Sequence, residues 1–319
     1  MEWNPTKFFR PAPPPNSYAL MILNQPINSN TYRILKGHEA HPANSRATAC
    51  FTICADGGAN HFHELMSKQG TESTELPNAI VGDLDSLRPS IRKHYEDLNV
   101  TVVQDSDQYS TDFTKCLRYL SSNIQNIIPP SSTPPSEPPP SSAASDVNGD
   151  TTEPHLDVIV LGGLGGRVDQ AFSQIHHLYT AAQSPPSVAG DLYLISEESI
   201  TFLLRSGRNS ILTPGGSWSS TSKHGGPEFL NGDTSEPDAE RRCYLSENVG
   251  IIPVGGASVI NTKGLEWDVQ DWKTEFGGQV STSNHIRADV VEIRTTVPVL
   301  FTVELATWLK FGSRSCEYV

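Results

Sequence analysis

The chain has 319 residues, of which 36% are hydrophobic and 18% charged, and its formal net charge is −13. This length allows one large or two ordinary domains with a sizeable buried core. The negative charge argues against a nucleic-acid backbone or an anionic membrane surface as partner, but not against a nucleotide whose charge a metal offsets. Five cysteines without Cys-x-x-Cys spacing favour a reducing compartment.

The N-terminal stretch is rich in proline and lacks the apolar core of a signal peptide. We therefore expect residues 1–16 to be flexible and the protein to be cytoplasmic. No later run approaches transmembrane length. The first strand is expected at 18–24 and the second at 51–55.

The second strand ends in Asp56, Gly57 and Gly58, and a short helical pattern follows. Glycines at such a turn let backbone N–H groups approach a ligand closely, and a helix N-terminus favours anions. A plain tight turn would use the same glycines, so this signal is weak by itself.

Two carboxylates follow the next apolar run, residues 79–82, because Asp83 and Asp85 stand one residue apart. In an extended chain residues i and i+2 point to the same side. We therefore expect these two side chains to converge just beyond the strand.

A further strand is expected at 100–103, and an amphipathic helix begins near Asp112 with Thr111 as its N-cap. Asp112 and Lys115 are three residues apart and share a face of its first turn. Mg²⁺ is usually held by one or two carboxylates together with waters and phosphates, and a lysine suits a phosphate oxygen. Each aspartate alone is typical of a turn or cap. Three near consecutive strand ends, with a lysine beside them, favour a metal site.

Residues 129–154 are almost all Pro, Ser, Thr, Ala and acidic residues, so we expect a disordered insertion there. A strand resumes at 156–161 and runs into a glycine-rich turn that carries Arg167 and Asp169. This turn suits close approach to phosphates, with Arg167 as donor, although the two side chains could simply pair with other residues. A helix follows, whose apolar face is expected to carry Phe172, Ile175, Tyr179 and Ala182.

Strands and helices alternate to about residue 183, which predicts an α/β domain over 17–187 with a parallel, Rossmann-like sheet in three layers. Ligands of such sheets bind at the carboxyl ends of the strands, where all these loops lie. From 191 onward short β-like runs predict an all-β antiparallel sandwich domain over 188–319, with a second flexible insertion at 217–246. Its strands are expected at 192–195, 200–204, 249–254, 257–261, 290–294 and 299–305.

Two stretches of the second domain stand out. Trp267 is either a core anchor or an aromatic wall for a flat ring. The run 281–284, Ser-Thr-Ser-Asn, is either an ordinary loop or a hydrogen-bonding shelf. Glu266 and Asp268 flank the tryptophan, and we expect them to be solvated.

Six short motifs occur in an order that resembles the thiamine pyrophosphokinases. They are Asp-Gly-Gly-Ala-Asn at 56–60, Gly-Asp-x-Asp-Ser at 82–86, Asp-Gln-x-x-Thr-Asp-x-x-Lys at 107–115, Gly-Gly-x-Gly-Gly-Arg-x-Asp-Gln at 162–170, Gly-Leu-x-Trp at 264–267 and Ser-Thr-Ser-Asn at 281–284. The resemblance spans both expected domains. It implies an enzyme of thiamine diphosphate biosynthesis, a transferase that moves the terminal diphosphate of ATP to the hydroxyl of thiamine and releases AMP.

The resemblance also implies roles for individual residues. It gives Mg²⁺ to Asp83, Asp85 and Asp112, with room for a second ion, and Asp112 or Asp107 is our choice of general base. The ATP pocket would be shaped by Asp56, Gly57, Gly58, Lys115, Arg167 and Asp169, and thiamine would contact Gln108, Trp267, Ser281, Thr282, Ser283 and Asn284. The family is homodimeric with active sites between subunits, so Trp267 can serve the partner's site.

Two other readings stay open at this point. Asp83-Leu84-Asp85 also matches the Asp-x-Asp with which many glycosyltransferases hold a metal and a nucleotide-sugar. A sensor that binds thiamine or a nucleotide without turnover is the second alternative, although every charged position of the motifs is filled.

Overall fold

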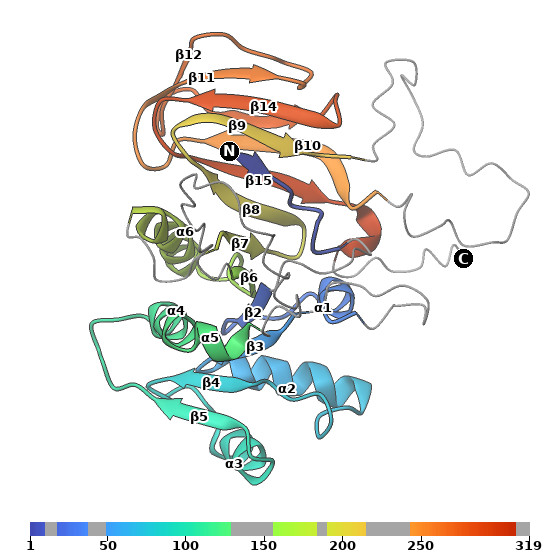
Figure 1. Ribbon diagram of the computed structural model, residues 1–319, viewed down its shortest axis with the longest axis vertical. Coiled ribbons are helices and arrows are strands. Elements are labelled where there is room, and N and C mark those ends of the chain that lie inside the picture. Colours follow the sequence, from blue (N-terminus) through green and yellow to red (C-terminus); the bar gives the residue numbers. More distant parts are fainter. Residues whose placement is uncertain (10–17, 38–48, 129–155, 184–189, 215–242, 311–319) are drawn as a thin grey trace, which may run out of the picture.

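The computed structural model describes residues 1–9, 18–37, 49–128, 156–183, 190–214 and 243–310. Two sheets organise this part of the chain, and helices cover one end of the larger sheet (Figure 1). The larger sheet has ten strands in the order β13-β10-β15-β8-β7-β6-β2-β3-β4-β5, and the smaller has five in the order β1-β9-β14-β11-β12. The expected insertion at 129–154 lies outside the described residues.

Six neighbouring strands of the large sheet are parallel, as the alternation of strands and helices predicts. They are β2 (Tyr18–Ile22), β3 (Phe51–Ala55), β4 (Ala79–Gly82), β5 (Thr101–Gln104), β6 (Asp157–Leu161) and β7 (Leu192–Ile195). The chain builds outward from β2 to β5 and then crosses to β6 on the other side of β2. The carboxyl ends of all six strands therefore lie at one edge, and the strand order reverses between β2 and β6.

Helices cover both faces of this parallel part. The helices are α1 (Ser29–Leu35), α2 (Gly58–Gln69) and α3 (Pro89–Asp97) on one face, and α4 (Asp112–Ser122), α5 (Ile124–Ile127) and α6 (Val168–Gln183) on the other. Strand β2 shows the division, because Leu20 and Ile22 pack with the first set and Ala19 and Met21 with the second. The expected three-layer architecture is confirmed.

The domain boundary expected at 187/188 does not break the sheet. Strand β7 pairs in parallel with β6, so it extends the α/β part, and β8 (Ser199–Leu204) then pairs with β7 in antiparallel fashion. The sheet continues through β15 (Val299–Leu305), β10 (Leu245–Ile252) and β13 (Ser281–His285). One sheet therefore runs through both parts of the molecule.

The five-stranded sheet packs on the antiparallel end of the large sheet and completes the expected sandwich. It consists of β1 (Glu2–Trp3), β9 (Gly207–Leu212), β14 (Val290–Thr295), β11 (Ser258–Lys263) and β12 (Trp272–Thr274). Its Ile260 and Ile293 share a core with Phe202 and Val303 of the large sheet. The 217–246 insertion overlaps the described residues only at 243–246, where Tyr244 is buried and β10 begins, so that end of it was placed too late.

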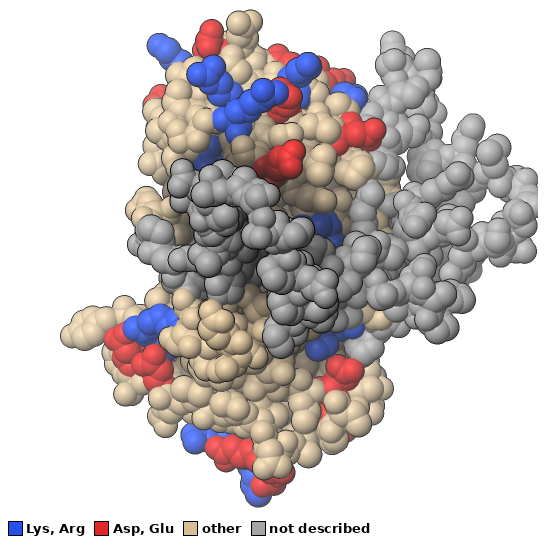
Figure 2. Space-filling model, viewed as in Figure 1, with Lys and Arg blue, Asp and Glu red and all other residues tan. Residues whose placement is uncertain are grey.

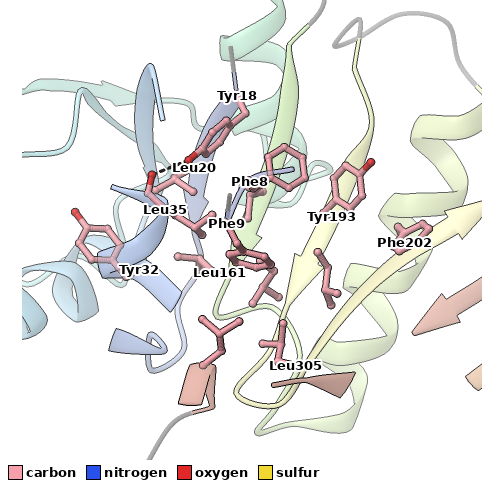
Figure 3. Close-up of a cluster of buried hydrophobic side chains, with 14 of the residues drawn as sticks. Phe8, Phe9, Tyr18, Leu20, Tyr32, Leu35, Leu161, Tyr193, Phe202 and Leu305 are labelled. Atoms are coloured by element: carbon pink, nitrogen blue, oxygen red, sulfur yellow. Dashed lines mark hydrogen bonds between the residues drawn. The ribbon is translucent and has the colours of Figure 1, made fainter. Parts of the chain in front are cut away.

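The N-terminal segment differs from the expectation of flexibility over residues 1–9. Strand β1 pairs with β9, the indole N–H of Trp3 donates to Asn209 Oδ1 at 2.9 Å, and Lys7 forms an ion pair with the buried carboxylate of Asp157. Phe8 and Phe9 are buried in the core, close to Tyr18 and Tyr193 (Figure 3). Burial of these two aromatic side chains orders residues 1–9, although the segment contains proline.

Helix α6 also differs from its predicted pattern. The buried residues are Gln174, His177 and Leu178, whereas Phe172 is 46% exposed. Because a histidine and a glutamine lie on the buried face, the spacing of the apolar residues alone does not show which face of the helix is buried.

No helix within the described residues combines the length and apolarity needed to cross a bilayer. The face in Figure 2 carries Asp and Glu interspersed with Lys and Arg.

Candidate active site

Three carboxylates meet at the carboxyl ends of two adjacent parallel strands. Asp56 follows β3, Asp83 follows β4, and Asp112 is the first residue of α4. One oxygen from each lies within 4.8 Å of the others. The pairing of β3 with β4 fixes the positions of Asp56 and Asp83, and the N-capped start of α4 places Asp112 beside them. The sequence predicts that Asp83 and Asp112 lie close together, and the structure agrees. It places Asp56 in the ATP pocket, whereas the structure brings Asp56 into the same cluster.

Gly82 makes this approach possible, a role that the sequence reasoning missed. A Cβ at this position would lie 2.6 Å from Asp56 Cβ and 3.1 Å from Asp112 Oδ1. The first distance is shorter than any ordinary contact, so a side chain here would displace the carboxylates. The pairing of β3 with β4 was the signal, since it places residue 82 beside residue 56.

Asp56 is the most buried member of the cluster, with 2% of its surface exposed. Its Oδ2 accepts from the N–H of Ser86 at 3.1 Å, while Oδ1 is buried with no hydrogen-bond partner among the described residues. Burial, together with the nearby charges of Asp112 and Asp85, raises the pKa of Asp56 to about 6. A hard divalent cation fits this site, because it would ligate the orphaned oxygen and offset the clustered charge.

Lys115 lies against the same carboxylates. Its Nζ is 3.0 Å from Asp112 Oδ1 and 3.3 Å from Asp83 Oδ2, and its side chain is 1% exposed. Burial alone would lower the pKa of Lys115, but these two partners raise it. In this structure the lysine compensates the charge of the acidic cluster, and its expected contact with a phosphate oxygen stays a prediction.

Asp85 is not among the three carboxylates whose oxygens lie within 4.8 Å of one another, but its side chain lies close enough to Asp83 and Asp56 to influence the pKa of both. The strand ends at Gly82, and Leu84 has φ of +68° with its side chain buried. The two-residue alternation therefore does not extend beyond the strand. Asp85 is exposed, its N–H donates to Asp83 Oδ1 at 3.3 Å, and its carboxylate accepts from Ser86.

The loop before α4 is organised by Asp107. This carboxylate accepts from the N–H of Tyr109, the hydroxyl of Ser110 and the guanidinium of Arg118, and its pKa is lowered, first by Ser110. These bonds fit a loop anchor better than a general base. Gln108 is exposed beside it. Thr111 caps α4 as predicted, with Oγ1 accepting from the N–H of Thr114 at 3.3 Å.

The two glycine turns serve the fold as well as any ligand. A Cβ on Gly58 would lie 2.3 Å from the backbone carbonyl oxygen of Ile22, so α2 can start here only with glycine at position 58, whereas a Cβ on Gly57 would meet the side chain of Asn24. After β6, Gly162 and Gly166 have positive φ and pack on Gln25 at the point where the strand order reverses. Arg167 and Asp169 are exposed and pair with each other at 2.6 Å.

Trp267 lies at a second candidate site, on the β-sandwich. It is 56% exposed and borders a cavity of about 280 Å³. The cavity is lined by Ile260, Thr262, Trp267, Val269, Trp272, Val280, Ser281, Thr282 and Asn284. Trp267, Ser281, Thr282 and Asn284 were predicted, Ser283 is not in the lining, and the apolar members were missed. A second tryptophan five residues after Trp267 was the available signal.

Asn284 holds Trp267 through the main chain. Its Oδ1 accepts from the N–H of Trp267 at 3.2 Å, and its Nδ2 donates to the carbonyl of Trp267 at 3.0 Å. Asp268 folds the turn by accepting from Thr262 and Gly264. Glu266 pairs with Arg287 and His285 instead of standing alone in solvent.

Comparison with known proteins identifies the family. The family model described as thiamin pyrophosphokinase, catalytic domain, matches residues 43–189, and the one described as its vitamin B1 binding domain matches residues 238–300. A thiamine pyrophosphokinase of Saccharomyces cerevisiae is 28% identical over 308 residues, covering 90% of this chain and 85% of the yeast protein.

Relatives from other organisms and solved structures agree. Thiamine pyrophosphokinase 1 of Oryza sativa is 27% identical and covers 92% of both chains. The crystal structure of yeast thiamin pyrophosphokinase has a TM-score of 0.69 with 26% identity, covering 96% of this chain and 91% of that one. That of Candida albicans has a TM-score of 0.68 with 23% identity, covering 96% and 92%, and supports the fold. Since the two family models together match well over half of the residues, the chain belongs to the thiamine pyrophosphokinase family.

Proposed function

We propose that the protein is an Mg²⁺-dependent thiamine pyrophosphokinase, which transfers the diphosphate of ATP to the hydroxyl of thiamine and yields thiamine diphosphate and AMP. The observation that carries the proposal is the cluster of Asp56, Asp83 and Asp112 at the carboxyl edge of the parallel sheet in a chain of this family. Its geometry suits a cation that holds the phosphates of a nucleotide.

In the reaction the hydroxyl oxygen of thiamine attacks the β-phosphorus, and the bond from that phosphorus to the α,β-bridging oxygen breaks. AMP leaves with the bond electrons, and the hydroxyl proton goes to a base. Such a transfer depends on alignment and on charge stabilisation at the phosphoryl oxygens. Mg²⁺ bound to the three carboxylates would supply that stabilisation.

The chain's own residues prepare this site. Gly82 admits the carboxylates, and Lys115 holds Asp83 and Asp112 in place before any ligand arrives. Once a cation shares these carboxylates, the Lys115 ammonium can turn part of its charge to a phosphate oxygen. Of the two predicted bases, Asp107 is engaged in its own loop and Asp112 pairs with Lys115, so the assignment of the base stays a prediction.

The acidic cluster and Trp267 lie far apart in one chain. Strand β13 is the first and β4 the ninth in the large sheet, so eight strand spacings separate them. At a little under 5 Å per spacing this is roughly 40 Å along the sheet. Figure 1 shows β11 and β12 at one end of the molecule and β4 and β5 at the other. A thiamine molecule cannot span this distance.

We therefore propose a homodimer in which Trp267 of one subunit faces the acidic cluster of the other. Exposed apolar side chains occur in both parts of the chain: Tyr109 in the loop before α4 and Phe172 on α6, and Trp267, Phe276 and Val280 in the β-sandwich part. Isolated exposed hydrophobics are ordinary, but a symmetric pairing would cover both groups at once. A cytoplasmic location, expected from the sequence, stays a prediction.

The reaction is tested by incubating purified protein with ATP and Mg²⁺, with and without thiamine, and by identifying the products by mass. Thiamine-dependent AMP together with thiamine diphosphate is expected. A folded protein that binds thiamine but releases no AMP would contradict the proposal and favour a sensor. Turnover of a nucleotide-sugar in its place would favour the glycosyltransferase alternative.

The shared site is tested by mixing inactive subunits. Asp112→Asn and Trp267→Ala chains are unfolded together, refolded at equal amounts and assayed at low thiamine concentration. If sites form between subunits, half of the dimers are mixed and each has one intact site, so about a quarter of wild-type activity returns. If each site lies within one chain, mixing gives no more than the mean of the two variants.

A further inference from the structure

His177 lies on the buried face of α6, close to the acidic cluster but outside every motif that the sequence suggested. It is 7% exposed. Helix α6 begins at Val168, directly after the glycine-rich turn, and packs beside α4, which carries Asp112. A side chain at position 177 therefore lies where α6 meets the start of α4.

Its contacts fall on both neighbours of Asp112. The Nε2 atom of His177 is 2.8 Å from the hydroxyl oxygen of Thr111, at hydrogen-bond distance. The imidazole also stacks on Phe113, with ring centroids 4.5 Å apart and planes 4° apart. Thr111 and Phe113 are the residues immediately before and after Asp112.

These two neighbours set the direction of the Asp112 side chain. Thr111 is the N-cap of α4, so its hydroxyl also accepts from the N–H of Thr114 and fixes the first helical turn. Phe113 is 2% exposed and anchors that turn in the core. The same turn carries Lys115, the ion-pair partner of Asp83 and Asp112.

A buried histidine usually serves only as a packed core residue, and its ring does fill space beside Phe113. Packing alone would be served by an apolar ring, however, and it would not require a nitrogen at 2.8 Å from a capping hydroxyl. Burial lowers the pKa of His177 to about 4, so the ring is neutral at physiological pH and adds no charge to the cluster.

We propose that His177 is a positioning residue for Asp112: from α6 it fixes the residues on both sides of this carboxylate and so couples helix α6 to the acidic cluster. The inference rests on the proposed function only in naming the cation and nucleotide that the cluster holds. The hydrogen bond and the stacking stand on the geometry alone.

The test separates the hydrogen bond from the packing. His177→Phe keeps a ring on Phe113 and removes the bond to Thr111, whereas Thr111→Val removes that bond together with the N-cap bond from the Thr114 N–H. The double variant completes a cycle, and Thr111→Ser keeps the hydroxyl. His176→Phe is the matched control, because His176 is the exposed neighbour on the same helix.

The first readout is Mn²⁺ binding, followed by the loss of the free-ion EPR signal, which requires no turnover. The second is the Michaelis constant for Mg·ATP compared with that for thiamine. Loss of one such hydrogen bond should weaken Mn²⁺ binding and kcat/KM for Mg·ATP roughly three- to tenfold, with the thiamine constant within about twofold. The double variant should be no worse than the worse single one, and Thr111→Ser should resemble wild type.

His177→Phe with Mn²⁺ affinity and Mg·ATP kinetics equal to those of His176→Phe would overturn the proposal. Fully additive losses in the double variant would also overturn it, because the two side chains would then act separately. If His177→Phe does not fold, His177→Leu compared with His176→Leu decides by the same criteria, since both leave the Thr111 cap in place. A wild-type protein that binds Mn²⁺ but makes no thiamine diphosphate would refute the proposed function and leave the Mn²⁺ comparison valid.

Discussion

Replacement of Lys115 by methionine tests the electrostatics of the acidic cluster most directly. Methionine preserves much of the side-chain volume but removes the one charge that lies within 3.3 Å of both Asp83 and Asp112. Three carboxylate groups then remain within 4.8 Å of one another. The folded state should lose stability because the unfolded chain separates these charges and hydrates them.

The size of the loss follows from the burial of the three partners. Breaking a fully buried ion pair by removing one partner costs about 3–5 kcal/mol. Lys115 is buried, but the side chains of Asp83 and Asp112 are 22% and 33% exposed, so water screens part of the repulsion. We therefore expect the free energy of unfolding to fall by about 2 kcal/mol without metal. Added Mg²⁺ should stabilise the variant more than the wild type, since it offsets an uncompensated charge.

The assay is chemical denaturation followed by tryptophan fluorescence, with and without Mg²⁺. The matched control is Lys93→Met, which removes an exposed lysine that pairs with Asp97 on α3. Its effect should be much smaller and independent of Mg²⁺. The reasoning is refuted if Lys115→Met costs no more than the control, or if Mg²⁺ stabilises both variants equally.

Three other changes test the site and the fold. Asp83→Asn or Asp112→Asn should reduce turnover more than about a hundredfold with an unchanged circular dichroism spectrum, and near-wild-type turnover would refute their assignment. Phe9→Ala should lower unfolding free energy by about 3 kcal/mol, whereas the exposed Phe276→Ala should not, which denaturation of both variants checks. Burial lowers the pKa of His177 to about 4. As the pH falls, this imidazole therefore binds a proton in the unfolded chain before it does so in the folded protein. The contribution of neutral His177 to the free energy of unfolding is therefore complete above about pH 6.5 and falls by about 3 kcal/mol toward pH 4. Denaturation of His177→Phe at each pH should not show this decline.

Much of the α/β part could be predicted from the sequence because its signals are local. The apolar runs of β2, β3, β4 and β6 are short, continuous and bounded by turns, as expected for strands buried on both faces. The capped start of α4 at Thr111 is also a local signal. Once the strands are known to be parallel, their ends must share one edge, which is why Asp83 and Asp112 were found together.

The remaining errors arise where the structure depends on contacts between distant residues. Asp56 joins the acidic cluster because β3 pairs with β4, and the chain beyond β4 bends at Leu84, which turns into the core with positive φ. Strand β13 contains Ser, Asn and His, and only its pairing with β10 makes it a strand. The order of residues 1–9 comes from β9 and Asp157, about 150 to 200 residues later.

The continuity of the large sheet has a consequence for the active site that the order of motifs in the sequence conceals. Six motifs in one chain suggest one site, yet β13 and β4 lie at nearly opposite ends of a single rigid sheet. A hinge between two separate domains could bring Trp267 to Asp83, but here hydrogen-bonded strands run without a break from β13 to β4 and keep the two ends apart. We therefore propose that the motifs act together in a dimer in which a second copy supplies one half. Each subunit then contributes its acidic cluster to one site and its aromatic cavity to the other, which is why mixed inactive subunits should recover activity that neither has alone.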